Sequence, residues 1–243
     1  MKQIKQTMIG LLLLAGASSS HALVATGGMS GIPGTYGDLT HDTTKWQDLS
    51  TATDTDGVRW SVDNGTTWGR SELFVGQTVK FQFSMHKRKV GTHYADLMKS
   101  WIDWGQDGVF DSTDAIAYGE YELSANEPRL GTNRDALGED GNGYTLFESN
   151  DIHLTSEHAG ETWLRAAVTC SHSIVAKEGD RWGEQWQSHY TDNYNDLFAS
   201  TGHLYQGETE EWKLTITEVP EPSTLALLGL GLAGLGFSRR KTK

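Results

Sequence analysis

The chain has 243 residues, with 20 Lys and Arg against 32 Asp and Glu, so its formal net charge is −12. This acidity disfavours nucleic acid and anionic membrane surfaces as partners of the body. Cys170 is the single cysteine, which excludes an intramolecular disulfide. The alternation of apolar and polar residues from Leu164 to Cys170 predicts that this thiol ends a buried strand.

The first 22 residues have the features of a secretory signal peptide. Lys2 and Lys5 precede an apolar run from Met8 to Ala15, and Ser20-His21-Ala22 is a small-residue cleavage site for signal peptidase. The segment therefore predicts an exported protein whose mature chain begins at Leu23.

The first half of the body contains two predicted strands. Residues 23–57 are Gly-rich and irregular, and residues 58–62 form a short strand that ends in the turn Asp63-Asn64-Gly65. Residues 79–85 alternate apolar with polar side chains, which predicts one buried and one solvated face in an antiparallel sheet. Residues 86–89, His-Lys-Arg-Lys, follow as a solvated basic patch.

The second half of the body adds further strands and two long polar segments, 124–143 and 171–207. The strands are predicted over residues 97–104, 115–123, 151–154, 162–170 and 208–217. No long helical periodicity and no repeat of fixed period is present. Many short strands with Gly-rich turns predict an all-β fold, an antiparallel β-sandwich of the jelly-roll or immunoglobulin-like kind.

An acidic loop follows the strand at 97–104. Its four aspartates are spaced much like the oxygen ligands of a calcium loop, and Gly108 stands where such loops turn sharply: Asp103, Asp107, Asp111 and Asp114. Gly105 supplies no ligand at the third position, and Asp114 is shorter than the usual glutamate. The alternatives are a Ca²⁺ loop between strands and an acidic turn whose carboxylates bond their own backbone.

Two glutamates extend the question to the last strand. By period two, Glu208 and Glu210 share the core-facing row of residues 212–216, and carboxylates at a core edge need a partner. One interpretation is an ion pair with Arg165. The other is a cation shared with the acidic loop, giving a candidate calcium site of six carboxylates: Asp103, Asp107, Asp111, Asp114, Glu208 and Glu210.

Three blocks of the body resemble the GEVED domain family. They are Trp101-Ile102-Asp103-Trp104-Gly105-Gln106-Asp107-Gly108, then Gly160-Glu161-Thr162-Trp163-Leu164-Arg165, then Gly207-Glu208-Thr209-Glu210-Glu211-Trp212, with Tyr36-Gly37-Asp38 upstream. The departures from the family pattern are Gly105, Thr209, Glu211 and Trp212. The resemblance implies that residues 58–218 form a β-sandwich accessory module of secreted bacterial proteins, with no known catalytic activity.

Aromatic residues in the segment 171–207 suggest a second kind of site. Four of them recur at four-residue spacing, as sugar-stacking platforms or as a helical turn that packs on the body: Trp182, Trp186, Tyr190 and Tyr194. No HExxH, Gly-x-Ser-x-Gly or phosphate loop is present. We therefore expect a non-enzymatic surface or matrix protein. The alternatives are a carbohydrate-binding or adhesion module for exopolysaccharide and, third, a secreted glycan-active enzyme with a carboxylate pair.

The C-terminal segment 219–243 has three parts in order: Val219-Pro220-Glu221-Pro222, an apolar run at 225–237, and a basic end at 239–243. This arrangement resembles the PEP-CTERM sorting tail. The resemblance implies an exosortase-type membrane protease as partner, cleavage near the Pro-Glu-Pro motif, and a Gram-negative, exopolysaccharide-producing source. The product would leave the inner membrane for the outer surface or the medium.

The physics of the tail agrees with a transient anchor. Thirteen apolar residues span about 20 Å as a helix, less than the roughly 30 Å hydrocarbon core. The alternative is a permanent single-span anchor, and in either case the membrane is contacted only through this helix. Removing the signal and the tail takes away six of the 20 basic residues, which leaves 14 against 32 acids and a formal charge of −18.

Overall fold

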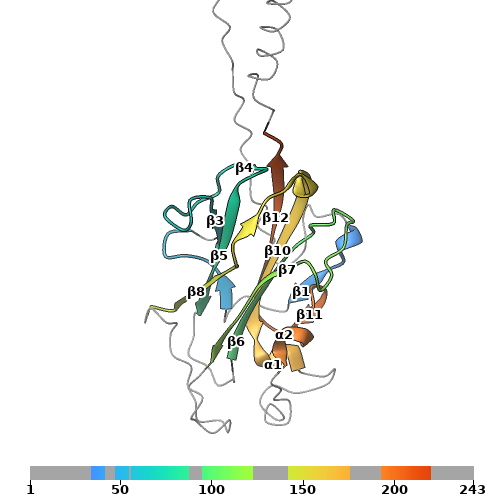
Figure 1. The fold of residues 1–243 in the computed structure, drawn as a ribbon. Coiled ribbons are helices and arrows are strands. Elements are labelled where there is room, and N and C mark those ends of the chain that lie inside the picture. The colour runs from blue at the N-terminus through green and yellow to red at the C-terminus, as the bar shows by residue number, and fades with distance from the viewer. Residues whose placement is uncertain are drawn as a thin grey trace, which may run out of the picture.

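The computed structural model describes residues 34–41, 47–54, 56–87, 95–122, 142–175 and 193–219. These residues are mostly β, with three sheets, one of them curled into a half-barrel, and few helices (Figure 1). The expected signal peptide and the tail beyond Val219 lie outside them. No helix in the described ranges is long and apolar enough to cross a membrane.

Three sheets contain all the named strands. The first has the order β4 (Leu73–Phe74), β12 (Glu208–Thr217), β10 (Gly160–Cys170), β6 (Ala95–Ile102) and β7 (Ala115–Glu122). In the second, β5 (Thr78–Lys87) pairs with β2 (Gln47–Leu49), β3 (Val58–Ser61), β8 (Tyr144–Glu148) and β9 (Ile152–His153). The third pairs β1 (Leu39–His41) with β11 (Gly202–Leu204). The short helices are η1 (Gly34–Tyr36), η2 (Ser156–His158), α1 (Ser171–Val175) and α2 (Tyr194–Leu197).

The main hydrophobic core lies between the two five-stranded sheets. Trp60 and Phe81 enter it from the β3–β5 side, and Leu164 and Trp212 enter it from β10 and β12. The Trp60 and Trp212 rings meet edge to face, with centroids 6.3 Å apart. The two sheets therefore meet across one apolar layer, and the predicted all-β class is confirmed.

The prediction of antiparallel pairing is confirmed for the long strands and is wrong for two pairs that include short strands. β12 and β4 run parallel, and so do β1 and β11. These pairs join segments that are far apart in the sequence, and such long connections permit parallel pairing where a tight hairpin does not.

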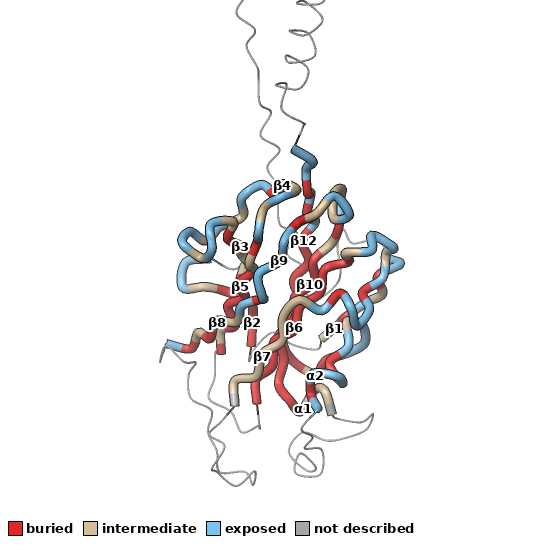
Figure 2. The backbone as a smooth tube through the Cα atoms, in the orientation of Figure 1, coloured by how far each residue is buried: buried red, intermediate tan, exposed pale blue. Residues whose placement is uncertain are grey.

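A second core covers the opposite face of the β6–β10 sheet. Tyr36, Trp101, Tyr194 and Phe198 lie in it, contributed by segments around η1, β6 and α2. All eight residues of β6 are buried, because Met98 faces the first core while its neighbours face the second. Figure 2 shows the resulting buried band along β6, β10 and β12.

Most long strands were predictable and most short ones were not. The predicted strands at 58–62, 79–85, 97–104, 115–123, 151–154, 162–170 and 208–217 are confirmed as β3, β5, β6, β7, β9, β10 and β12. β1, β2, β4, β8 and β11 were missed, because segments of two to five residues are too short to display a period. The predicted burial of Cys170 is confirmed.

The predicted basic patch and wet strand face need correction. Lys87 is buried and forms a 2.7 Å ion pair with Asp96, because β5 continues to this residue and runs beside β2 and β8. Gln82, expected on the solvated face of β5, is also buried. Its side chain accepts a hydrogen bond from Arg59 Nε at 2.6 Å and donates one to Glu148 at 2.7 Å.

Candidate functional site

The acidic loop begins with a buried carboxylate. Asp103 follows β6, and its Oδ2 accepts hydrogen bonds from the Tyr36 hydroxyl at 2.6 Å and from the Gly108 N–H at 2.9 Å. Its Oδ1 accepts from the Asp107 N–H at 3.2 Å. Burial, and then the bond to Asp103, raise the pKa of the Tyr36 hydroxyl. Both oxygens of Asp103 are therefore directed at donors of the protein.

The other aspartates of the loop also bond its own backbone. Asp107 Oδ1 accepts from the Val109 N–H at 3.0 Å, and Asp111 Oδ1 accepts from the Thr113 N–H at 2.6 Å. Asp114 accepts from the Asp111 N–H at 2.9 Å, and burial raises the pKa of its carboxyl. This pattern is the self-bonded turn, one of the two alternatives that the sequence leaves open.

The candidate calcium site of six carboxylates is not assembled. Asp103 lies on the Tyr36 side of the sheet, whereas Glu208 and Glu210 face the main core with Trp212. Glu208 Oε2 accepts from the Leu49 N–H at 2.6 Å. Side chains alternate between faces, so the strand period separates the two groups. Within the described ranges, no group of three or more His, Cys, Asp or Glu is placed to hold a metal ion.

Arg165 pairs with Glu211, and the predicted pairing with Glu208 or Glu210 is wrong. The Arg165 Nη2–Glu211 Oε1 distance is 2.6 Å, and both side chains are buried. Arg165 also donates to the carbonyl oxygens of Ser200 at 2.5 Å and Gly37 at 2.9 Å. Its guanidinium therefore fastens the segments around β1 and β11 to the outer face of β10.

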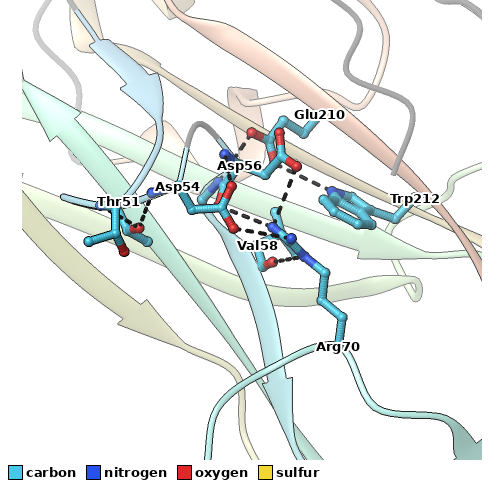
Figure 3. Close-up of polar contacts among 9 residues, drawn as sticks. Thr51, Asp54, Asp56, Val58, Arg70, Glu210 and Trp212 are labelled. Atoms are coloured by element: carbon cyan, nitrogen blue, oxygen red, sulfur yellow. Dashed lines mark hydrogen bonds and ion pairs between the residues drawn. The ribbon is translucent and has the colours of Figure 1, made fainter. Parts of the chain in front are cut away.

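A polar cluster around Glu210 is the main feature that sequence inspection missed (Figure 3). We call Asp54, Asp56, Arg70, Glu210 and Trp212 the Glu210 cluster. Arg70 lies 3.1 Å from Asp54 and 3.6 Å from Asp56, and its guanidinium lies over the Trp212 ring at 4.3 Å. Glu210 accepts hydrogen bonds from the Gly57 N–H at 3.2 Å and from Trp212 Nε1 at 3.3 Å.

The cluster ties the 50–57 loop to strand β12. A sequence signal for it exists in Asp54-Thr55-Asp56-Gly57, an acidic turn that ends in glycine. A Cβ on Gly57 would lie 2.5 Å from the carbonyl oxygen of Ser84, so this position requires glycine. The loop can therefore approach β5 and place its Gly57 N–H on the Glu210 carboxyl.

Acidic groups outnumber the cation in this cluster. Burial raises the pKa of Glu210 well above its ordinary value, and the charges of Glu208 and Asp56 raise it further. Burial also raises the pKa of Asp56, against the opposing effect of Arg70. Asp56 Oδ1 is buried with no hydrogen-bond partner. Arg70 is the one cation of the cluster beside three carboxylates, so the charged form of Glu210 is disfavoured.

We expect Glu210→Gln to stabilise the protein at neutral pH and to flatten its pH dependence. A carboxyl with a raised pKa stabilises the fold below its unfolded pKa, and this contribution is lost as the pH rises through the folded value. Glutamine imitates the protonated form and keeps an acceptor for the Gly57 N–H. The measurement is urea unfolding from pH 4 upward.

Glu157→Gln, at an exposed position in η2, is the control and should leave the pH profile unchanged. A wild-type stability that does not decline between mildly acidic and neutral pH would contradict a protonated Glu210. Burial also raises the pKa of Asp56, so stability can still decline with pH in the Glu210→Gln variant. Adding Asp56→Asn should remove that remaining decline if Asp56 causes it.

The C-terminal end of β12 leads directly into the tail. Thr217 pairs with Phe74 of β4, and its carbonyl oxygen accepts a hydrogen bond from the Val75 N–H at 3.0 Å. Glu218 and Val219 follow and are exposed. Residues 218–241 match the PEP-CTERM protein-sorting motif.

The PEP-CTERM match implies that the protein is exported, sorted to the cell surface and processed by exosortase. Of the predicted sorting residues, Val219 is described, whereas Pro220, Glu221 and Pro222 lie outside the described residues. A comparison with curated proteins gave no match. The matched residues are confined to the tail, so they carry no evidence on the GEVED resemblance of the body.

One of the four predicted sugar-stacking residues is buried in the body. Tyr194, at the start of α2, is 2% exposed and packs in the second core near Phe198, so its ring cannot stack on a sugar. The alternative of packing onto the body is confirmed for this residue. Trp182, Trp186 and Tyr190 lie outside the described residues.

Proposed function

We propose that the body, residues 58–218, is a non-enzymatic GEVED-type β-sandwich that exosortase delivers to the outer surface or extracellular matrix. The PEP-CTERM match is the observation that supports sorting to the surface. Two facing sheets around one apolar core support the module type. The signal peptide expected at residues 1–22 supplies the first export step through signal peptidase.

The placement of the carboxylates supports the non-enzymatic part of the proposal. Glycoside hydrolysis needs two carboxyl groups on either side of a bound sugar. Glu208 and Glu210 share one face of β12, and their side chains are only 8% and 1% exposed. They bond the backbone of Leu49 and Gly57. Hydrolysis of the producer's exopolysaccharide by the purified body would contradict this part of the proposal.

Replacing Pro220 and Pro222 together with Ala is expected to block processing. The rigid Pro-Glu-Pro segment is the feature that the protease would recognise, so the variant should accumulate at full length in the inner membrane. The measurement is a pulse-chase in the producing bacterium, with membrane and surface fractions separated. Pro33→Ala, far from the tail in sequence, is the control. Wild-type processing of the double variant would overturn the sorting proposal.

Calcium enters the proposal only as a ligand of a rearranged acidic loop. As described, Asp103 is occupied by donors from Tyr36, Asp107 and Gly108, so a cation would have to replace these hydrogen bonds. If it does, Ca²⁺ should raise the Tm and Asp107→Ala should abolish the rise. An equal Tm in Ca²⁺ and in chelator would exclude calcium binding and leave only the interpretation as a self-bonded turn.

Binding of exopolysaccharide is the second candidate function. A hollow of about 340 Å³ beside the 62–65 turn supports it, since six of its seven lining residues have polar side chains: Ser61, Asp63, Asn64, Thr78, Lys80 and Asp151, with Val62 as the apolar member. Trp182, Trp186 and Tyr190 remain as the aromatic candidates. The measurement is retention of the protein on the producer's own polysaccharide. Loss of retention in the Trp182→Ala, Trp186→Ala variant would place the binding site on the aromatic segment. Loss in the Asn64→Ala, Thr78→Ala variant would place it in the hollow.

A further inference from the structure

We infer that the unprocessed protein stands end-on at the membrane. The C-terminal end of β12 faces the lipid, and the acidic surface around this end keeps the sorting motif clear of the headgroups. The inference rests on the PEP-CTERM assignment of the tail and goes beyond it, because it orients the folded body and explains how the protease reaches its motif.

The tether between the folded body and the membrane is short. Thr217 is held by β4, and the apolar run that would enter the hydrocarbon begins at Leu225. The eight Cα-to-Cα steps between them span at most about 28 Å when fully extended. Thr217 therefore lies within this distance of the hydrocarbon boundary.

The length of β12 excludes the inverted orientation. β12 has ten residues, Glu208–Thr217, and its nine Cα-to-Cα steps span about 31 Å. If its N-terminal end faced the lipid, the tail would have to run back along the whole strand before it reached the membrane. The tether is shorter than that path. The end that contains Thr217 is consequently the membrane-proximal end.

This membrane-proximal end is acidic. Around it lie the turn after β4, the start of β5 and η2, and Figure 2 shows mostly exposed backbone there. Its acids are Glu72, Asp151, Glu157, Glu161 and Glu218. Its lysines are both paired, Lys80 with Asp151 at 3.4 Å and Lys213 with Glu161 at 2.7 Å. An excess of negative charge therefore faces the bilayer.

Charge favours the end-on arrangement over one in which the body lies on its side. The mature body carries a formal charge of −18, and an anionic leaflet repels it within a Debye length of about 8 Å. Lying flat would bring far more of this charge within that distance than standing on one end. The repulsion holds the folded body away from the headgroups, which leaves room for a membrane protease to reach the 220–222 motif.

The orientation can be measured without the protease. The chain from Leu23 onward is reconstituted into phosphatidylcholine vesicles that contain phosphatidylglycerol and a headgroup-attached energy acceptor. A donor dye is placed on Glu157→Cys in η2 or on Asp196→Cys in α2, while Cys170 is buried. We expect stronger energy transfer from position 157. Equal transfer from both positions, or stronger transfer from 196, would overturn the inference.

Charge reversal tests the second half of the inference. Glu72→Lys with Glu218→Lys should raise the transfer from position 157 in anionic vesicles and leave it unchanged in pure phosphatidylcholine. Glu148→Lys with Asp196→Lys makes the same change in net charge at exposed positions elsewhere and is the control. An equal rise in both pairs, or none in either, would exclude a role for this end.

A longer tether provides an independent check. Eight Gly and Ser residues inserted between Val219 and Pro220 roughly double the reach, so the difference between positions 157 and 196 should shrink. An unchanged difference would contradict the tether argument. Because the vesicles contain no exosortase, these results are separable from the fate of the Pro220 and Pro222 variant.

Discussion

Replacing Arg165 with Ala is expected to lower the free energy of unfolding by about 3–5 kcal/mol, because it leaves a buried carboxylate without its cation. Glu211 would lose its 2.6 Å partner, and the carbonyl oxygens of Ser200 and Gly37 would lose their donors. Phe110 would lose the guanidinium that lies 4.9 Å from its ring centroid. Urea unfolding of the purified body measures the change.

The ion pair between Lys213 and Glu161 is the matched control. Its N–O distance of 2.7 Å is nearly the same, but both side chains are exposed, so Lys213→Ala should cost less than about 1 kcal/mol. Burial lowers the pKa of Arg165 and raises that of Glu211, which shows that desolvation opposes the buried pair. Arg165→Met with Glu211→Leu should therefore recover much of the loss. A cost for Arg165→Ala as small as the control would contradict this account.

Replacing Gly207 with Ala is expected to cost about 3–5 kcal/mol or to prevent folding, for two separable reasons. The residue has a φ of +120°, which L side chains rarely adopt. A Cβ there would also overlap the carbonyl oxygen of Val168 and approach the Cα of Thr169 within 3.1 Å. Both neighbours are backbone of β10, so neither can rotate away.

Gly202 separates the conformational cost from the steric one. It has a φ of +125°, and a Cβ there would meet nothing within 4 Å. Gly202→Ala should therefore cost only the backbone strain, about 1–3 kcal/mol. The difference between the two variants, measured as urea midpoints, reports the overlap with Val168. Equal losses at both positions would mean that β10 yields to the new methyl group.

The last strand, β12, shows which features the alternation of apolar and polar residues can predict. Alternation predicted β12 with its bounds, and it placed Trp212 and Ile216 in the core. It also placed Glu208 and Glu210 on that face. The partner of Arg165 was not predictable, because Glu211 sits one residue away and a step of one residue exchanges the two faces of a strand.

The acidic loop is a second case in which local spacing does not identify the contacts that a carboxylate makes. Its aspartate spacing is compatible with a cation and with a self-bonded turn, since both use the same oxygens. In the described structure the Tyr36 hydroxyl donates a hydrogen bond to Asp103 from 67 positions away in the sequence, a contact that the loop pattern does not predict. The Glu210 cluster was missed for a related reason, since its loop and strand meet only in the folded sheet.

The sorting signal and the all-β class of this protein were both predictable from local sequence patterns. The PEP-CTERM tail is recognised as a linear motif, and strand periodicity is a local property, so neither needs a folded context. The hydrogen-bond partners of the carboxylates, the burial of Tyr194 and the pairing of Thr217 with β4 were found only in the folded structure. These depend on strand register and on contacts between distant segments, which burial and hydrogen bonding select after the chain has folded.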